Sequence, residues 1–179
     1  MHEFHWRPGI GDPTLGGWVT VGLYVLAAVS ALRTFREVEG LGEGTFWRGI
    51  FVMLVVLGIN KQLDIQSAIT ELGRILAFSE GWYDRRQTVQ VWFIMAVAAA
   101  CFVLAVVLLL LVRQAPAPTW VALIGMAVVL AFVLVRAASF HHIDRFIGDR
   151  ILGLKWNWVL EMGGLSIMLL GSEWRRRLS

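Results

Sequence analysis

Two short polar segments carry most of the residues in this chain that could do acid–base or metal chemistry. Residues 136–144 read RAASFHHID and follow an apolar run, and residues 60–64 read NKQLD and follow another. Ionisable side chains are costly beside hydrocarbon, so they are expected to pair with one another or to serve a function. We predict that the two segments lie together at one edge of a helical membrane bundle and form its most distinctive chemical site.

The same membrane face is expected to receive polar residues from several spans, because successive spans cross the membrane in opposite directions. Asn60, Asp64 and Glu71 recur at steps that place them on one helix face, and Asn157 and Glu161 are four apart on the last span. All four histidines of the chain fall on this side. The predicted polar cluster consists of Asn60, Lys61, Asp64, Glu71, Arg136, Ser139, His141, His142, Asp144, Asn157 and Glu161.

A divalent metal such as zinc or iron is one ligand that this cluster could hold. His141, His142 and Glu161 supply suitable donors and would leave a position for water. The alternative is that the histidines cap a helix end and pair with Asp144 or Glu161. Adjacent residues on a helix point about 100° apart and no HExxH spacing occurs, so the metal-free alternative is favoured.

Single residues of the cluster also have two interpretations. Glu161 is either a proton-accepting or metal-binding carboxylate or the partner of Arg136 or Lys61 in an ion pair, and the ion pair is favoured. Lys61 lies near a helix end with Asp64 at hand. A lysine that snorkels toward water and is paired is therefore expected rather than a base of lowered pKa.

Composition identifies lipid as the solvent of this chain. Of 179 residues, 58% are hydrophobic and 16% are charged, and the mean hydropathy is +0.68. Soluble domains are nearer 45–50% apolar and about 25% charged. The net charge of +3 comes with no Lys/Arg run that suggests nucleic-acid binding, and the single cysteine excludes an intrachain disulfide.

Apolar segments predict an all-α membrane bundle of about five transmembrane helices in a single domain over 1–179. The spans are expected near 17–35, 46–62, 88–112, 119–140 and 156–174, with an amphipathic interfacial helix over 63–78. Asp12 is expected to cap the first span and Thr119 the fourth. Glycines 163, 164 and 171 are expected to allow close helix packing in the last span.

Aromatic and basic residues at the ends of the apolar segments indicate contact with membrane lipids. The tryptophans expected in interfacial belts are Trp18, Trp47, Trp82, Trp92, Trp120, Trp156 and Trp174. Arg85 and Arg86 either bind a lipid phosphate or anchor the chain at the interface. The C-terminal basic run 175–177 favours an outside N-terminus and a cytoplasmic C-terminus, although the plain count of basic residues mildly opposes this orientation.

Four phrases carry a family resemblance: residues 58–66 (GINKQLDIQ), 81–83 (GWY), 136–144 and 157–161 (NWVLE). They resemble a family of small bacterial integral membrane proteins without an established activity, and the likeness covers nearly the whole chain. The resemblance implies the bacterial inner membrane. Ser139, His141, His142 and Asp144 are also residue types of the seven-span ceramidase-like hydrolases, but the number of spans and the motif spacing differ.

Two functions follow as hypotheses. The first is a non-enzymatic accessory or assembly component whose polar edge meets another membrane protein or lipid headgroups. The second is a membrane-embedded, metal-dependent hydrolase or transferase that acts on a lipid. Haem- or quinone-linked electron transfer is less favoured, because both candidate axial histidines lie on one segment.

Overall fold

The structure is a computed structural model that describes residues 14–63, 86–138, 150–151 and 154–178. At residues 86–90, 93, 136–138, 150–151 and 154–157 the description covers the backbone alone. The interfacial helix predicted over 63–78 and the polar arm before Thr14 therefore lie almost wholly outside the described residues.

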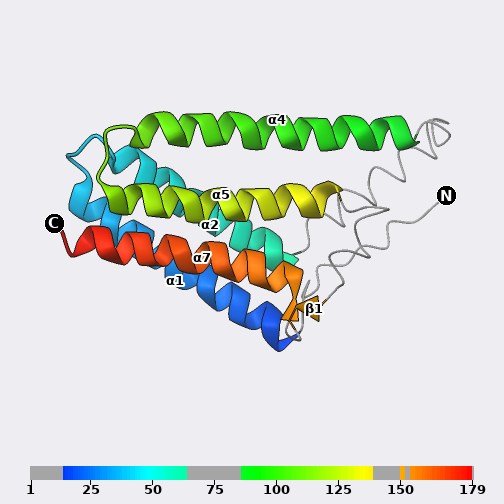
Figure 1. The fold of residues 1–179 in the computed structure, drawn as a ribbon, viewed down its shortest axis with the longest axis horizontal. Coiled ribbons are helices and arrows are strands. Elements are labelled where there is room, and N and C mark those ends of the chain that lie inside the picture. Colours follow the sequence, from blue (N-terminus) through cyan, green and yellow to red (C-terminus); the bar gives the residue numbers. More distant parts are fainter. Residues whose placement is uncertain (1–13, 64–85, 139–149, 152–153, 179) are drawn as a thin grey trace.

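Five long helices make up the described part of the chain, and they run side by side (Figure 1). Their bounds are α1 (Leu15–Val38), α2 (Gly44–Leu63), α4 (Arg86–Val112), α5 (Ala117–Ala138) and α7 (Trp156–Arg176). Two short antiparallel strands, β1 (Arg150–Ile151) and β2 (Leu154–Lys155), immediately precede α7. The predicted all-α class of the bundle is confirmed.

Four of the described helices are long and apolar enough to cross a membrane: α1, α2, α4 and α5. This indicates a multi-pass membrane protein. The predicted fifth span is present as the helix α7 but does not belong to this set, because Glu161, Glu173 and Arg175 lower its apolar character. Glu161 and Arg175 are buried against other helices, whereas Glu173, near the end of α7, accepts a hydrogen bond from Ser30 of α1 and is partly exposed.

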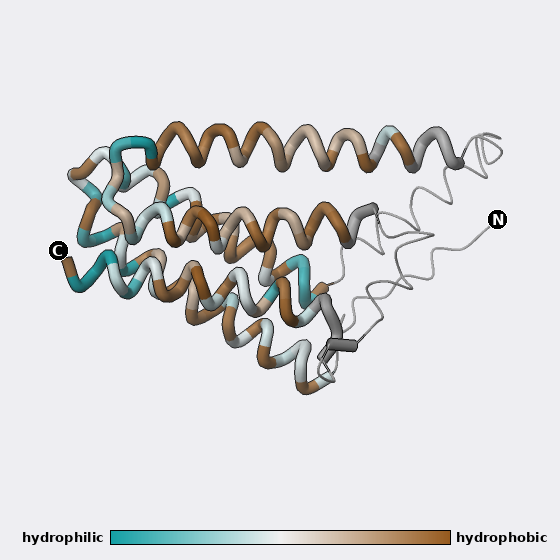
Figure 2. The backbone as a smooth tube through the Cα atoms, in the orientation of Figure 1, coloured by the Kyte–Doolittle hydropathy of each residue, from teal (hydrophilic) through white to brown (hydrophobic). Residues whose placement is uncertain are grey.

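The helices alternate in direction, so one end of the bundle holds the start of α1, the end of α2 and the start of α7 (Figure 1). We call this the α7-start end. The opposite end holds the α1–α2 turn, the α4–α5 turn and the C-terminal arginines, and we call it the C-terminal end. Figure 2 shows a hydrophilic stretch in the α4–α5 turn and a mixture of hydrophilic and hydrophobic positions in the α1–α2 turn, whereas the helices between the ends are largely hydrophobic.

Glycines allow α5 and α7 to come into backbone contact. A Cβ atom on Gly125 would lie 2.5 Å from the Met168 nitrogen, and one on Gly164 would lie 2.9 Å from the Gly125 carbonyl oxygen. A Cβ on Gly171 would lie 2.6 Å from the Ala122 nitrogen. Small residues drive helix association in lipid because they permit this close approach. The predicted packing role is confirmed for Gly164 and Gly171 and is wrong for Gly163, beside which there is open space.

Two predicted helix caps are wrong. The cap of α1 is Thr14, whose side chain accepts a hydrogen bond from the Gly17 nitrogen at 3.2 Å, and not Asp12. The helix α5 begins at Ala117, so Thr119 lies in its first turn instead of capping it. Its hydroxyl is buried and donates to a carboxylate at the C-terminal end.

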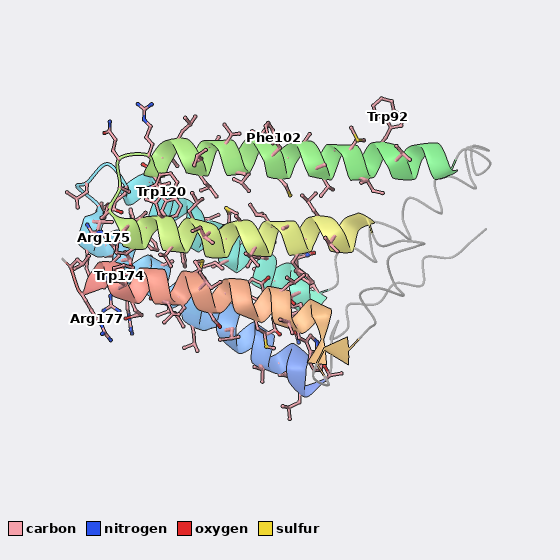
Figure 3. All side chains as sticks on the ribbon, viewed as in Figure 1. Trp92, Phe102, Trp120, Trp174, Arg175 and Arg177 are labelled. Carbon is pink, nitrogen blue, oxygen red and sulfur yellow. The ribbon has the colours of Figure 1, made fainter. Side chains whose placement is uncertain are left out.

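The tryptophans divide between the membrane interface and the protein interior. Trp92 projects from α4 away from the rest of the bundle, and Trp174 lies at the C-terminal end (Figure 3). These two and Trp18 are exposed near helix ends, as interfacial anchors should be. Trp47 is fully buried, so its predicted place in an interfacial belt is wrong. Trp82 lies outside the described residues.

Candidate functional site

A buried ion pair joins α2 to α7 at the α7-start end. The Lys61 Nζ lies 2.9 Å from the Glu161 Oε2, and the two side chains are only 7% and 2% exposed. The Tyr24 hydroxyl on α1 donates a hydrogen bond to the other carboxylate oxygen, Glu161 Oε1, at 3.1 Å. Three helices therefore meet at one carboxylate.

Local packing places each of these groups. Lys61 lies in the last turn of α2, and Glu161 lies about a turn and a half into α7. Gly58, one turn before Lys61, faces the Tyr24 ring: a Cβ atom at Gly58 would lie 3.2 Å from the Tyr24 Cβ. The missing side chain lets α1 and α2 approach closely enough for Tyr24 and Lys61 to reach the same carboxylate.

The electrostatics of this site require both charges to be present. Transfer of a single charged side chain out of water costs several kcal/mol, which attraction to a close partner and additional hydrogen bonds can offset. Glu161 accepts one donor at each oxygen. Among the described residues, no buried side-chain nitrogen or oxygen lacks a hydrogen-bond partner. Loss of either member would leave a buried charge without compensation.

The geometry shows Lys61 as a partner of Glu161 and corrects the prediction that Lys61 snorkels; the side chain of the other predicted partner, Arg136, lies outside the described set. The Lys61–Glu161 pair is present, and it was one of the two expected ion pairs. The expectation that Lys61 snorkels toward water is wrong, because its side chain turns into the bundle. Asn60 lies beside it on α2 and is half-buried.

The rest of the predicted polar cluster stays a prediction. The side chains that lie outside the described set are Asp64, Glu71, Arg136, Ser139, His141, His142, Asp144 and Asn157, together with the predicted lipid contacts Arg85 and Arg86. The proposed metal ligands His141 and His142 are among them. Within the described residues, no group of three His, Cys, Asp or Glu side chains is close enough to hold a metal ion.

A second buried ion pair, which sequence reasoning missed, lies at the C-terminal end. The Arg175 Nε donates to Glu43 Oε1 at 2.6 Å, and both residues are buried. Thr119 and the Trp47 indole N–H donate to the other oxygen, Glu43 Oε2. Because successive spans cross the membrane in opposite directions, the sequence could have placed Glu43, Trp47, Thr119 and Arg175 at one end of the bundle. The sequence pattern instead assigned Trp47 to the interface and Thr119 to a helix cap.

Polar side chains also line the contact between the parallel helices α1 and α7. The Ser172 hydroxyl lies 2.8 Å from the hydroxyls of both Ser30 and Thr34. Closer to the C-terminal end, the Arg176 Nε donates to Glu37 Oε1 at 3.1 Å, and this hydrogen bond raises the pKa of the guanidinium. Together with Tyr24 and Glu161, these contacts fix the register of α7 against α1 along its length.

Comparison with known proteins adds no family to this description. No protein-family model matches the chain, and no similar protein was found among curated proteins or solved structures. The resemblance to a family of bacterial membrane proteins therefore stays a prediction. Function has to be argued from the bundle itself.

Proposed function

We propose that this protein is a non-enzymatic multi-pass component of the bacterial inner membrane that acts as an accessory or assembly subunit. The observation that carries the proposal is the exposure of α4. Only 6% of its apolar stretch, Ile94–Val112, is buried in the described bundle. In Figure 1, α4 lies along the outer side of α5 and away from α1 and α7.

One face of the exposed surface of α4 carries small residues, as helix–helix contacts in membranes do. Ala96, Ala100 and Val103 are exposed and lie on one face, because they are spaced four and three residues apart. Helices associate in lipid through small residues that permit close approach, as the Gly125–Gly164 contact illustrates inside this bundle. A second membrane protein that packs on this face is the partner expected for an accessory subunit.

The two buried ion pairs support the same proposal. Lys61 donates a hydrogen bond to one carboxylate oxygen of Glu161, and Tyr24 donates to the other. Such a pair fixes the arrangement of helices without requiring a substrate. The face of α4 is therefore the surface on which we place the contact with a partner.

Site-specific photo-crosslinking in native membranes tests the proposal. A photoreactive residue at Val103 is compared with one at Val56 on α2, because the two side chains are similarly exposed, 60% and 58%. We expect one protein adduct of defined mass from position 103 and lipid adducts alone from position 56. Ala100→Leu should abolish the protein adduct while the variant stays folded. Lipid adducts alone from position 103 would contradict the proposal.

The metal-dependent hydrolase or transferase is tested separately. Metal content is measured for the purified wild type and for the double variant His141→Ala/His142→Ala. Stoichiometric zinc or iron that is lost in the double variant would contradict the non-enzymatic proposal. We expect a folded wild type without stoichiometric metal.

We further propose that the N-terminus lies outside and the C-terminus in the cytoplasm. Seven arginines stand at or near the C-terminal end of the bundle: Arg33, Arg36, Arg48, Arg113, Arg175, Arg176 and Arg177. Basic residues near span ends are retained on the cytoplasmic side.

A further inference from the structure

A cavity of about 450 Å³ lies at the C-terminal end, where the α1–α2 turn faces the α4–α5 turn. Its walls combine apolar side chains with hydrogen-bond donors and one carboxylate. The residues that matter for its chemistry are Leu41, Glu43, Leu110, Arg113, Gln114 and Arg175. This cavity is at the opposite end of the bundle from the Lys61–Glu161 pair.

Arg175 lines this cavity and has donors that no described group engages. Its side chain is only 8% exposed, and its Nε is held by Glu43 Oε1. Its two terminal NH₂ groups donate to no described group, yet neither is fully buried, since no buried side-chain nitrogen in the described chain lacks a partner. Because Arg175 lines the cavity, these donors are available to a ligand there. Figure 3 shows Arg175 at this end of the bundle.

The cavity carries a net positive charge. Both oxygens of Glu43 are engaged, one by Arg175 and the other by Thr119 and Trp47, so the Glu43 carboxylate balances the Arg175 charge. Arg113 is exposed and makes no ion pair with a described side chain, so its charge is left over. The Gln114 amide is a further donor at the rim.

The cavity lies at the depth of lipid headgroups. Arg113 directly follows Val112, the last residue of the apolar helix α4, and α5 begins only four residues after Arg113. Leu41 and Leu110 are both exposed on the cavity walls. Figure 2 shows the hydrophilic α4–α5 turn joined directly to the hydrophobic end of α4. A ligand here meets guanidinium groups on one side and hydrocarbon on the other.

We propose that this cavity binds the phosphate of an anionic phospholipid. Arg113 and Arg175 donate hydrogen bonds to the phosphate oxygens, and Leu110 contacts the first carbons of an acyl chain. Guanidinium groups suit phosphate because their planar donors match its oxygens, and basic pockets between transmembrane helices recognise anionic headgroups in this way. The leucines favour a lipid over free phosphate, since an inorganic ion gains nothing from an apolar wall.

Lipid titration of the full-length protein in a neutral detergent tests this proposal. The thermal unfolding midpoint is followed while phosphatidylglycerol, phosphatidylcholine or inorganic phosphate is added. We expect a saturable rise with phosphatidylglycerol, a weaker response to phosphatidylcholine and none to inorganic phosphate. Arg113→Gln should raise the half-saturating concentration of phosphatidylglycerol about fivefold, the effect of one basic residue near an anionic lipid surface.

Arg177→Gln is the matched control, because Arg177 is exposed at the same end but does not line the cavity. It should leave the titration unchanged. Leu110→Ser is a second variant and should weaken the response to lipid without altering the unfolding midpoint in detergent alone. Equal weakening by Arg113→Gln and Arg177→Gln would overturn the cavity as the site. A saturable response to inorganic phosphate that Arg113→Gln removes would overturn the assignment to a lipid.

Discussion

Lys61 and Glu161 are a hundred residues apart in the sequence, and their side chains meet at 2.9 Å inside the bundle. The contact joins the end of α2 to the start of α7, and the Tyr24 hydroxyl of α1 completes it. Polar side chains from α1, α2 and α7 therefore meet at the Glu161 carboxylate.

Removal of the Glu161 carboxylate should destabilise the protein strongly. Glu161→Leu leaves the buried Lys61 ammonium without a partner, and the loss of one member of a buried ion pair costs about 3–5 kcal/mol of unfolding free energy. The double variant Lys61→Met/Glu161→Leu should recover most of this loss, since no unpaired charge remains. Unfolding by SDS in mixed micelles measures both. A double variant less stable than Glu161→Leu alone would show that the pair does not couple the helices.

Tyr24→Phe isolates the third member of this site. The substitution removes the hydroxyl that donates to Glu161 Oε1 and keeps the ring that packs over Gly58. We expect a loss of about 0.5–2 kcal/mol in the same unfolding measurement, in the range of interhelical hydrogen bonds in membranes. Tyr24→Phe should cost far less in the Glu161→Leu background, where the acceptor is already gone. An equal cost in both backgrounds would exclude Glu161 as the relevant acceptor.

Glycine substitutions should separate close helix contact from helix propensity. Gly125→Val places side-chain atoms against the Met168 backbone, and overpacking of this kind costs about 1–3 kcal/mol or more. Gly163→Ala is the control, because there is open space beside Gly163, and the change should be neutral or should stabilise by up to about 1 kcal/mol. Thermal unfolding in detergent compares the two. Similar losses at both positions would contradict a specific α5–α7 contact.

The contribution of the Glu43–Arg175 ion pair to the free energy of unfolding should depend on its burial. Glu43→Ala removes the counter-ion of buried Arg175 and the acceptor of Thr119, so we expect a loss of about 3–5 kcal/mol. Glu37→Ala is the matched control, since its pair with Arg176 is partly exposed and should contribute less than about 1 kcal/mol. Equal effects of Glu43→Ala and Glu37→Ala on the unfolding free energy would show that burial does not set these energies.

The orientation has a direct chemical test. Cys101 is first replaced by serine, and a single cysteine is then placed at Leu15 or at Leu178, which are both exposed at opposite ends of the bundle. A membrane-impermeant maleimide added to intact spheroplasts should label position 15 and not position 178. Labelling at position 178 alone would reverse the proposed orientation.

Several features of this fold follow from the sequence directly. Apolar segments predicted the positions of five helices. The alternating direction of successive spans predicted that Lys61 and Glu161 would share one end of the bundle. Gly164 and Gly171 signalled close packing. These predictions succeed because hydropathy measures transfer to lipid, and alternating spans leave only two ends at which a residue can lie.

Only the tertiary structure decided which side chains meet at each end. The alternating direction of the spans does not set the rotation of a helix about its axis or its distance from a neighbour. Lys61 could therefore have reached Asp64 or water, and instead it turns toward Glu161. In the same way Trp47, a tryptophan at a helix end, is buried against Glu43. Rotation and distance are decided where glycines let backbones touch, as Gly125 and Gly164 do, and that contact requires two segments that the sequence keeps far apart.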